Sequence, residues 1–187
     1  MRSKVHISLE GLDGAGKSTA RKSLVDHYTL TGREVAELTS PSRRPEGQYL
    51  RQNMLLLSTE EIERLIIEDL RDSEAAIPED TEIAIWDRHI DSLYTSNRGS
   101  DLGRICLLAA GLTLPKKTFY LRLDSSTAYE RAAPITDHDL DKEWLDYKFE
   151  RYEELLRANP DRIIPIDANQ PANVVLHEIT EHLKEDL

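Results

Sequence analysis

The chain has 187 residues, with 35 acidic against 24 basic side chains and a formal net charge of −11. A hydrophobic share of 39% and a charged share of 32% are typical of a globular protein and exclude a disordered, low-complexity chain. The acidic balance disfavours long nucleic acid and anionic membranes as partners, and no apolar run reaches the roughly 18 residues needed to span a bilayer. Cys106 is the only cysteine, which excludes an intrachain disulfide and fits a cytoplasmic protein.

Short β-rich apolar runs alternate with helical patterns along the chain. Strands are expected at residues 5–9, 34–38, 82–86, 118–123 and 162–166. Helices are expected from about residue 17, at 46–57, 60–76 and 141–158, and from about residue 172. Strands joined by helical crossovers predict one three-layer α/β/α domain over residues 1–187, with a five-stranded parallel sheet. Ligands of such sheets bind at the carboxyl ends of the strands, so the chemistry is expected there.

The segment between the first strand and the first helix has the pattern Gly-x-x-x-x-Gly-Lys-Ser, from Gly11 to Ser18. Gly14 and Gly16 permit backbone conformations and a close approach that a Cβ atom would block. In such a loop the N–H groups converge on phosphate oxygens, Lys17 neutralises the β- and γ-phosphates, and Ser18 ligates Mg²⁺. The pattern therefore predicts a P-loop NTPase fold with ATP and Mg²⁺ as cofactors.

Asp87 and Arg88 directly follow the third predicted strand, at the edge where ligands are expected. Phosphoryl transfer depends on positioning and charge neutralisation. A carboxylate here would orient a nucleophilic oxygen or hold Mg²⁺-bound water, and a guanidinium would bridge the donor and acceptor phosphates. A signalling GTPase would need Asn/Thr-Lys-x-Asp, but the one Lys-x-Asp, at Lys184, follows a leucine. The pattern favours an ATP-dependent kinase.

Four segments together resemble the thymidylate kinase family of nucleoside monophosphate kinases. Residues 9–19 are similar to its phosphate loop and 87–92 to its Asp-Arg-Tyr/His segment. Residues 120–131 are similar to its Leu-x-Leu-Asp strand and Glu-Arg lid entry, and 166–171 to its Ile-Asp-Ala-Ser-Gln-Pro loop near the ATP adenine. The resemblance covers nearly the whole chain. It implies ATP-dependent phosphorylation of a nucleoside monophosphate, with dTMP favoured, by a homodimer with a short helical lid at about residues 131–142.

The resemblance also implies roles for individual residues. The implied catalytic residues are Lys17, Asp87, Arg88 and the lid arginine Arg131. The implied ATP-binding residues are Gly11, Asp13, Gly14, Ala15, Gly16, Lys17, Ser18, Thr19, Asn169 and Gln170, and the implied Mg²⁺ ligands are Ser18 and Asp87. On the acceptor side, Asp13 would accept a hydrogen bond from a sugar hydroxyl, Arg88 would steady the phosphates, and Ser96 and Asn97 would contact the base.

The loop after the second strand departs from the family pattern Arg-Glu-Pro-Gly-Gly-Thr, whose arginine holds the acceptor phosphate. With Gly47 aligned to the family's glycine, Thr39 and Ser40 stand where Arg-Glu would be. Arg43 and Arg44 lie nearby and are candidates to replace that arginine in a different register.

Two further features of the family are altered. Leu57 is the best positional match for the phenylalanine on which the base stacks, and either Arg64 or Arg71 would replace the arginine one turn later. No arginine occurs from residue 132 to 150, so a second lid arginine is missing.

These departures leave two alternatives open. The first is a kinase that phosphorylates another hydroxyl, on a nucleoside, a modified base in nucleic acid or another small metabolite. The second is a module that binds ATP without transferring its phosphate. The net charge of −11 argues against long nucleic acid as the acceptor.

Overall fold

The computed structural model describes residues 4–132 and 141–187. Its strands form one sheet in the order β2-β3-β1-β4-β5, and every neighbouring pair is parallel. The strands are β1 (Val5–Glu10), β2 (Val35–Thr39), β3 (Ile83–Asp87), β4 (Lys117–Arg122) and β5 (Ile163–Asp167). The predicted five-stranded parallel sheet is confirmed, and each strand begins within one residue of the position expected from the sequence.

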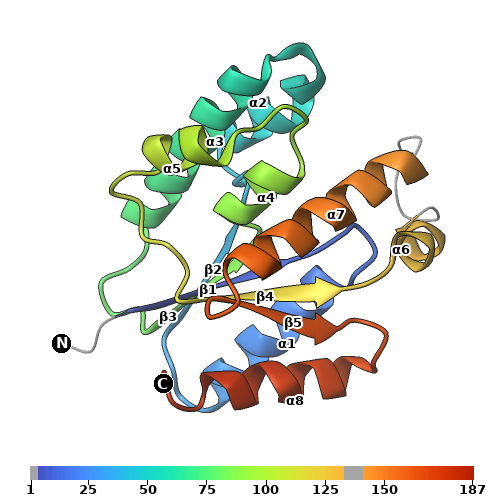
Figure 1. The fold of residues 1–187 in the computed structure, drawn as a ribbon. Coiled ribbons are helices and arrows are strands. Elements are labelled where there is room, and N and C mark those ends of the chain that lie inside the picture. The colour runs from blue at the N-terminus through green and yellow to red at the C-terminus, as the bar shows by residue number, and fades with distance from the viewer. Residues whose placement is uncertain (1–3, 133–140) are drawn as a thin grey trace.

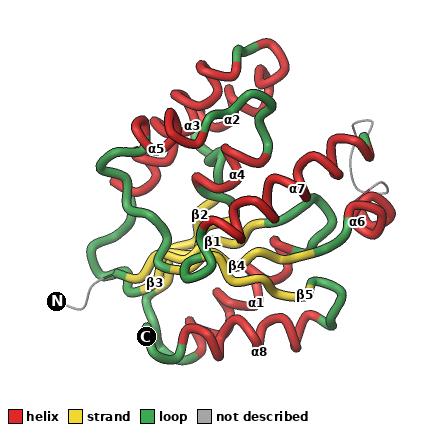
Figure 2. Tube along the Cα trace, in the orientation of Figure 1, coloured by secondary structure: helices red, strands yellow, loops and turns green. Residues whose placement is uncertain are grey.

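Helices cover both faces of this sheet (Figures 1 and 2). They are α1 (Lys17–Leu30), α2 (Pro45–Asn53), α3 (Thr59–Ala75), α4 (Ile90–Thr95), α5 (Leu102–Leu108), α6 (Ser125–Ala132), α7 (Lys142–Ala158) and α8 (Ala172–Leu183). Helices α1 and α8 pack together on one face, and α7 packs with α4 on the other. The three-layer α/β/α architecture is confirmed.

The helices differ from the sequence-based expectation in two ways. The helix expected at 46–57 ends at Asn53 and is followed by a 3₁₀ turn, Met54–Leu56. The sequence analysis did not identify α4, α5 or α6 as helices. Each has eight residues or fewer, which is too short for an apolar repeat to stand out.

The core has two parts, a large cluster around β1, β4, α1, α7 and α8 and a smaller one around α3, α4 and α5. Every residue of β1 is buried, as expected for a central strand of a parallel sheet covered on both faces. A second cluster joins α3 to the sheet through Leu70 and Trp86, both with no exposed surface, and Leu50 attaches α2 to it. This second cluster fixes the helices α2–α5 relative to the carboxyl end of β3.

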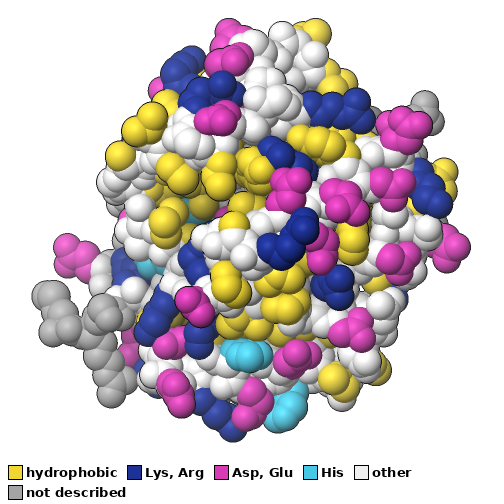
Figure 3. Space-filling view, viewed as in Figure 1, with side chains coloured by type: hydrophobic (Ala, Val, Ile, Leu, Met, Phe, Trp, Pro, Cys, Tyr) yellow, Lys and Arg dark blue, Asp and Glu magenta, His cyan; other side chains and the backbone are white. Residues whose placement is uncertain are grey.

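Residues 133–140, which contain most of the predicted lid, lie outside the described residues. Helix α6 leads into them and α7 follows them. Basic and acidic side chains are interspersed over the face shown in Figure 3. None of the helices described is both long enough and apolar enough to cross a membrane.

Candidate active site

The loop between β1 and α1 requires its glycines. Gly11 and Gly14 have φ values of 140° and 86°. A Cβ atom at Gly11 would lie 2.6 Å from the carbonyl oxygen of Leu121, and one at Gly14 would lie 2.7 Å from that of Ala128. Gly16 precedes α1, and no described side chain caps the first turn of that helix. The loop can therefore present backbone N–H groups at a helix N-terminus, as an anion requires.

Lys17 is buried at the end of this loop. Its Nζ donates hydrogen bonds to the carbonyl oxygens of Gly11, at 3.0 Å, and Leu12, at 2.7 Å. Burial, reinforced by the charge of Arg88, lowers the pKa of Lys17 to about 7. Its positive charge is therefore poorly stabilised in the free protein, and an anion in front of the loop would stabilise it.

Asp87, the last residue of β3, faces the loop from the neighbouring strand. Ser18 Oγ lies 3.5 Å from Asp87 Oδ2, and Arg21 Nη1 lies 3.9 Å from the same oxygen. A hydroxyl and a carboxylate beside a phosphate-binding loop form an oxygen donor set that suits Mg²⁺ completed by water and phosphate oxygens. The described residues contain no group of three or more His, Cys, Asp or Glu side chains that could hold a metal ion without such help.

Arg88 has a φ of 71°, in the left-handed region that residues other than glycine seldom adopt. Its Nη2 donates to Asp13 Oδ1 at 2.6 Å, and its Nη1 lies 3.3 Å from Ser92 Oγ. Lys148 of α7, which the sequence analysis did not identify, donates to Asp13 Oδ2 at 3.2 Å. Burial alone would raise the pKa of Asp13, but Arg88, Lys148 and Lys17 outweigh it and hold this pKa below its usual range.

Two cavities meet at Arg88. The loop cavity, of about 690 Å³, lies in front of the phosphate loop, and the side cavity, of about 190 Å³, lies between α3, α4 and α7. Ser40, Pro41 and Arg88 line both. The loop cavity is also lined by Asp13, Gly14, Gly16, Lys17, Ser18, Thr19, Thr39, Arg51, Asp87, Arg131 and Ala132. The structure thus brings most of the predicted phosphate-binding and catalytic residues together.

The side cavity has an apolar wall and a few polar groups. Met54, Ile62, Ile66 and Leu93 line it, together with Lys148 and the expected pair Ser96 and Asn97. His89 also lines it and is almost fully buried. Within residues 4–132 and 141–187, neither ring nitrogen of His89 has a hydrogen-bond partner, and Ser96 Oγ has none either. Burial lowers the pKa of His89 to about 3, so the imidazole is neutral. These groups are available to a polar edge of a ligand.

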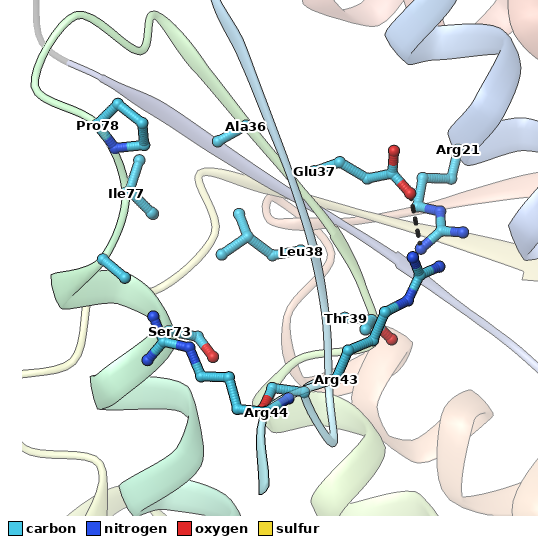
Figure 4. A pocket seen from close by; sticks show the side chains of 12 residues that line it. Arg21, Ala36, Glu37, Leu38, Thr39, Arg43, Arg44, Ser73, Ile77 and Pro78 are labelled. Atoms are coloured by element: carbon cyan, nitrogen blue, oxygen red, sulfur yellow. Dashed lines mark hydrogen bonds and ion pairs between the residues drawn. The ribbon is translucent and has the colours of Figure 1, made fainter. Parts of the chain in front are cut away.

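Arg43 and Arg44 line neither of these two cavities, and this placement disfavours the expectation that they anchor the acceptor. Both line a separate cavity of about 460 Å³ beside the edge strand β2. Arg43 points toward Arg21 there, and Arg44 points toward Ser73 (Figure 4). Arg44 is also fixed by a 2.7 Å hydrogen bond from Nη1 to the carbonyl oxygen of Asp72.

Arg51, which the sequence analysis did not single out, is the arginine near the loop after β2 that lines the loop cavity. It extends from the last turn of α2 into the loop cavity, where it donates to the carbonyl oxygens of Pro41 and Ser42. Asp69 of α3 holds the same loop by accepting a 2.7 Å hydrogen bond from the N–H of Ser42. The sequence signal for Arg51 is its place one helical turn after Gly47, on the face that packs against this loop.

The predicted replacements Arg64, Arg71 and Leu57 also do not line the side cavity. Arg64 is exposed and pairs with Glu68 at 2.9 Å, and Arg71 donates to the carbonyl oxygen of Leu108 at 2.6 Å. Leu57 packs against the second core cluster without lining the side cavity. The side cavity receives Ile62 and Ile66 from α3, and the part of the chain described here places no aromatic ring in its wall except the imidazole of His89.

The remaining predicted residues lie at the opposite end of the loop cavity. Arg131 Nη1 donates to the carbonyl oxygen of Ala168 at 2.9 Å. Ala15, Thr19, Arg131 and Gln170 line an adjoining cavity of about 150 Å³. Asn169 is turned away from it, bonded through Nδ2 to Asp167 at 3.1 Å, and lines a different cavity. Gln170 therefore lines the cavity that adjoins the loop cavity, and Asn169 does not.

Comparison with known proteins agrees with this geometry. The family profile described as thymidylate kinase matches residues 9–179. A thymidylate kinase from Pediococcus pentosaceus is 29% identical, with 97% of each chain covered. Thymidylate kinases from Acinetobacter baylyi and Dinoroseobacter shibae are 26% and 28% identical, and each comparison covers 95% of this chain. These comparisons cover 98% and 95% of the two relatives.

Proposed function

The chain belongs to the thymidylate kinase family and is an ATP-dependent nucleotide kinase, and we propose that it phosphorylates nucleoside monophosphates with dTMP as the favoured acceptor. The observation that carries this proposal is the junction of the loop cavity and the side cavity at Arg88. A donor phosphate chain in the first cavity and a base in the second would place the acceptor phosphate between them.

The donor lies along the phosphate loop. Its phosphates accept hydrogen bonds from the loop N–H groups, and Lys17 turns from the carbonyl oxygens of Gly11 and Leu12 to the β- and γ-phosphates. The adenosine end extends toward Arg131 and Gln170. Ser18 and Asp87 would hold Mg²⁺, which would neutralise part of the phosphate charge.

The acceptor phosphate lies between two guanidinium groups. Arg51 enters the loop cavity from α2, and Arg88 enters it from the end of β3. Guanidinium groups bind phosphate oxygens through paired hydrogen bonds, so these two would fix the attacking oxygen in line with the γ-phosphorus. Arg88 borders both cavities and is placed to stabilise the charge that develops on the transferred group, while Asp87 orients the reactants.

The base occupies the side cavity. Its volume of about 190 Å³ suits a single ring better than a whole nucleotide. Ile62 and Ile66 would contact one face of the ring, and Ser96, Asn97 and the neutral His89 would bind its polar edge. A pyrimidine such as thymine fits this combination of size and chemistry.

The proposal also includes the parts of the protein that lie beyond this site. A single kinase domain closes over ATP through a lid at about residues 131–142, in which Arg131 is the arginine available. Two copies associate through helices that flank β3. The protein acts in the cytoplasm, with a small nucleotide as its substrate.

A second candidate function keeps the kinase and changes the acceptor. It is favoured by the side cavity, because the described part of its wall offers aliphatic side chains rather than a large aromatic ring for stacking. Under this alternative the acceptor is another monophosphate, a nucleoside or a small metabolite. A module that holds ATP without transferring phosphate is the remaining alternative.

Release of ADP measured across a panel of acceptors tests the proposal. The panel contains dTMP, the other deoxynucleoside monophosphates, thymidine, and a short oligonucleotide. The proposal predicts turnover with monophosphates, highest with dTMP, and little with thymidine. Turnover with thymidine alone would support the changed acceptor, and tight ATP binding with no ADP release on any acceptor would support the binding module.

A further inference from the structure

We propose that the cavity beside β2 is a second ligand site, which binds a phosphate monoester with an apolar body and holds its phosphate group between Arg21 and Arg43. We call this cavity, of about 460 Å³, the edge cavity. The inference goes beyond the kinase reaction, because the proposed function assigns the donor and the acceptor to other cavities.

The edge cavity carries an excess of positive charge. Its charged lining residues are three arginines, Arg21, Arg43 and Arg44, and one acid, Glu37. The lining therefore has two positive charges in excess, in a chain whose net charge is −11. A phosphate monoester carries about −1.5 to −2 charges at neutral pH, which matches this excess better than a single carboxylate does.

Two of these guanidinium groups converge. Arg43, from the loop after β2, points toward Arg21 of α1 (Figure 4). Guanidinium groups that face each other repel, whereas a phosphate between them can accept hydrogen bonds from both. Within residues 4–132 and 141–187, the guanidinium of Arg43 forms no hydrogen bond or ion pair, so its donors remain free for a ligand.

Arg21 is held in place and still has an unused donor. Only 13% of its side-chain surface is exposed, and its Nη1 forms an ion pair with Glu37 at 3.2 Å. Its buried Nε has no hydrogen-bond partner among the described residues. A buried donor without a partner is unfavourable, and a phosphate oxygen is a strong acceptor for it.

The rest of the edge cavity suits an apolar body. Ala36 and Leu38 lie on one side of β2, opposite Ile77, while Glu37 lies on the other side with Arg21 (Figure 4). Ala36, Leu38 and Ile77 are only half-buried, so a ligand could cover them further. The ligand would cross the outer side of β2, the edge strand of the sheet, where backbone polar groups are left unpaired.

The edge cavity is next to the active site but distinct from it. Among the described residues, Thr39 is the one that lines both the edge cavity and the loop cavity, and none lines both the edge cavity and the side cavity. Arg21 and Arg43 line neither the loop cavity nor the side cavity. A ligand in the edge cavity would therefore leave the donor and the acceptor in place.

An NMR titration of isotopically labelled protein tests the inference. The active site is first filled with a non-hydrolysable ATP analogue and dTMP, and phenyl phosphate is then added as the probe. We expect saturable shifts at the backbone amides of β2 and of Ile77. Phenyl phosphate should bind about tenfold more tightly than inorganic phosphate, because its ring covers apolar surface, and phenol should give no saturable shifts.

Three variants assign the binding to these residues. Arg43→Met removes one of the two guanidinium groups and should weaken phenyl phosphate binding by at least about tenfold. Glu37→Gln removes the competing partner of Arg21 and should tighten binding by about 2–5-fold, the range for an exposed ion pair. Arg64→Met, at an exposed arginine that pairs with Glu68, is the matched control and should bind as the wild type does. Because Glu37→Gln is expected to gain affinity, a loss of folding cannot imitate its effect.

The outcomes separate this inference from the proposed function. Binding that is unchanged in Arg43→Met overturns the inference, and so does inorganic phosphate that binds as tightly as phenyl phosphate. A tenfold loss of kcat/KM for the acceptor in Arg43→Met would place this arginine in the active site and overturn the inference too. A wild type that phosphorylates no monophosphate overturns the proposed function alone, since the ATP analogue by itself fills the phosphate loop during the titration.

Discussion

The donor half and the acceptor half of this active site are built in different ways. In the proposed function, the donor half is one continuous segment, Gly11 to Ser18, whose own backbone would bind phosphate between β1 and α1. The acceptor half combines side chains from α2, α3, α4 and α7 and from the loop after β2. A site formed by the backbone of one loop tolerates few changes, whereas a site assembled from separate helices can exchange its residues one at a time.

The largest expected effect of a substitution on kcat is at Lys17, in the donor half. Lys17→Ala removes the only side-chain cation within the phosphate loop and is expected to lower kcat by about 10²–10³-fold, comparable to the loss of one preorganised transition-state donor. Thermal unfolding should change little, because Lys17 bonds to its own loop rather than to distant elements. The matched control is Lys22→Ala, an exposed lysine of the same helix that pairs with Asp26. A fully active Lys17→Ala variant would refute the donor assignment.

The acceptor half is tested by a pair of arginines. Arg51→Met removes a guanidinium from the loop cavity and is expected to lower kcat/KM for the acceptor by about 10–100-fold, the range for a charge-assisted hydrogen bond. Arg64→Met removes an exposed arginine that pairs with Glu68 and should change it by less than about twofold. Steady-state kinetics with varied dTMP measure both. The opposite ranking of the two variants would favour Arg64, one of the two arginines of α3 that the sequence analysis left open as acceptor-binding residues.

These arginines show how much of the fold and of the candidate site could be predicted from the sequence. The phosphate loop and all five strands were predicted, because each is a contiguous pattern with its own local cause. In α3 the apolar residues Ile62 and Ile66 face inward, and Arg64, two residues from each, must face outward because two residues turn a helix by about 200°. Periodicity alone could have excluded Arg64.

Other parts of the acceptor half could not be found in the same way. Arg51 and the Arg43–Arg44 pair are all basic residues near the loop after β2, and only the packing of α2 decides which of them enters the loop cavity. Lys148 reaches Asp13 across 135 positions of sequence. Such contacts depend on tertiary packing, which no local pattern records.

The low pKa of Lys17 predicts a pH effect confined to the donor half. In the free protein this pKa is about 7 rather than 10.5, so above pH 7 the lysine is mostly neutral. Bound phosphates would keep it charged, and ATP binding should therefore take up close to one proton at pH 8. The affinity should fall as pH rises above 7, approaching tenfold per pH unit.

Calorimetry in buffers of different ionisation enthalpy measures the proton taken up. The Lys17→Ala variant should lose this uptake, and Arg51→Met should keep it. Uptake that persists in Lys17→Ala would assign the proton to another group.

The smallest expected effect lies at the adenosine end of the donor half. Gln170→Ala is expected to raise the KM for ATP by a few fold, about 1 kcal/mol for a neutral hydrogen bond, because Gln170 lines the cavity beside Ala15 and Thr19. Asn169→Ala should leave the KM for ATP unchanged, since Asn169 is bonded to Asp167 and faces a different cavity. Equal effects of the two changes would contradict this placement of the adenosine.

The meeting of donor and acceptor halves at Arg88 is tested most directly with a single molecule that spans both. A molecule in which adenosine and thymidine are joined through five phosphates would place its adenosine in the adenosine region and its thymine in the side cavity at once. Isothermal titration should show it binding at least about 100-fold more tightly than ATP, by the gain from linking two sites. Arg51→Met should remove much of that gain without weakening ATP. Binding no tighter than ATP would contradict a continuous donor–acceptor site.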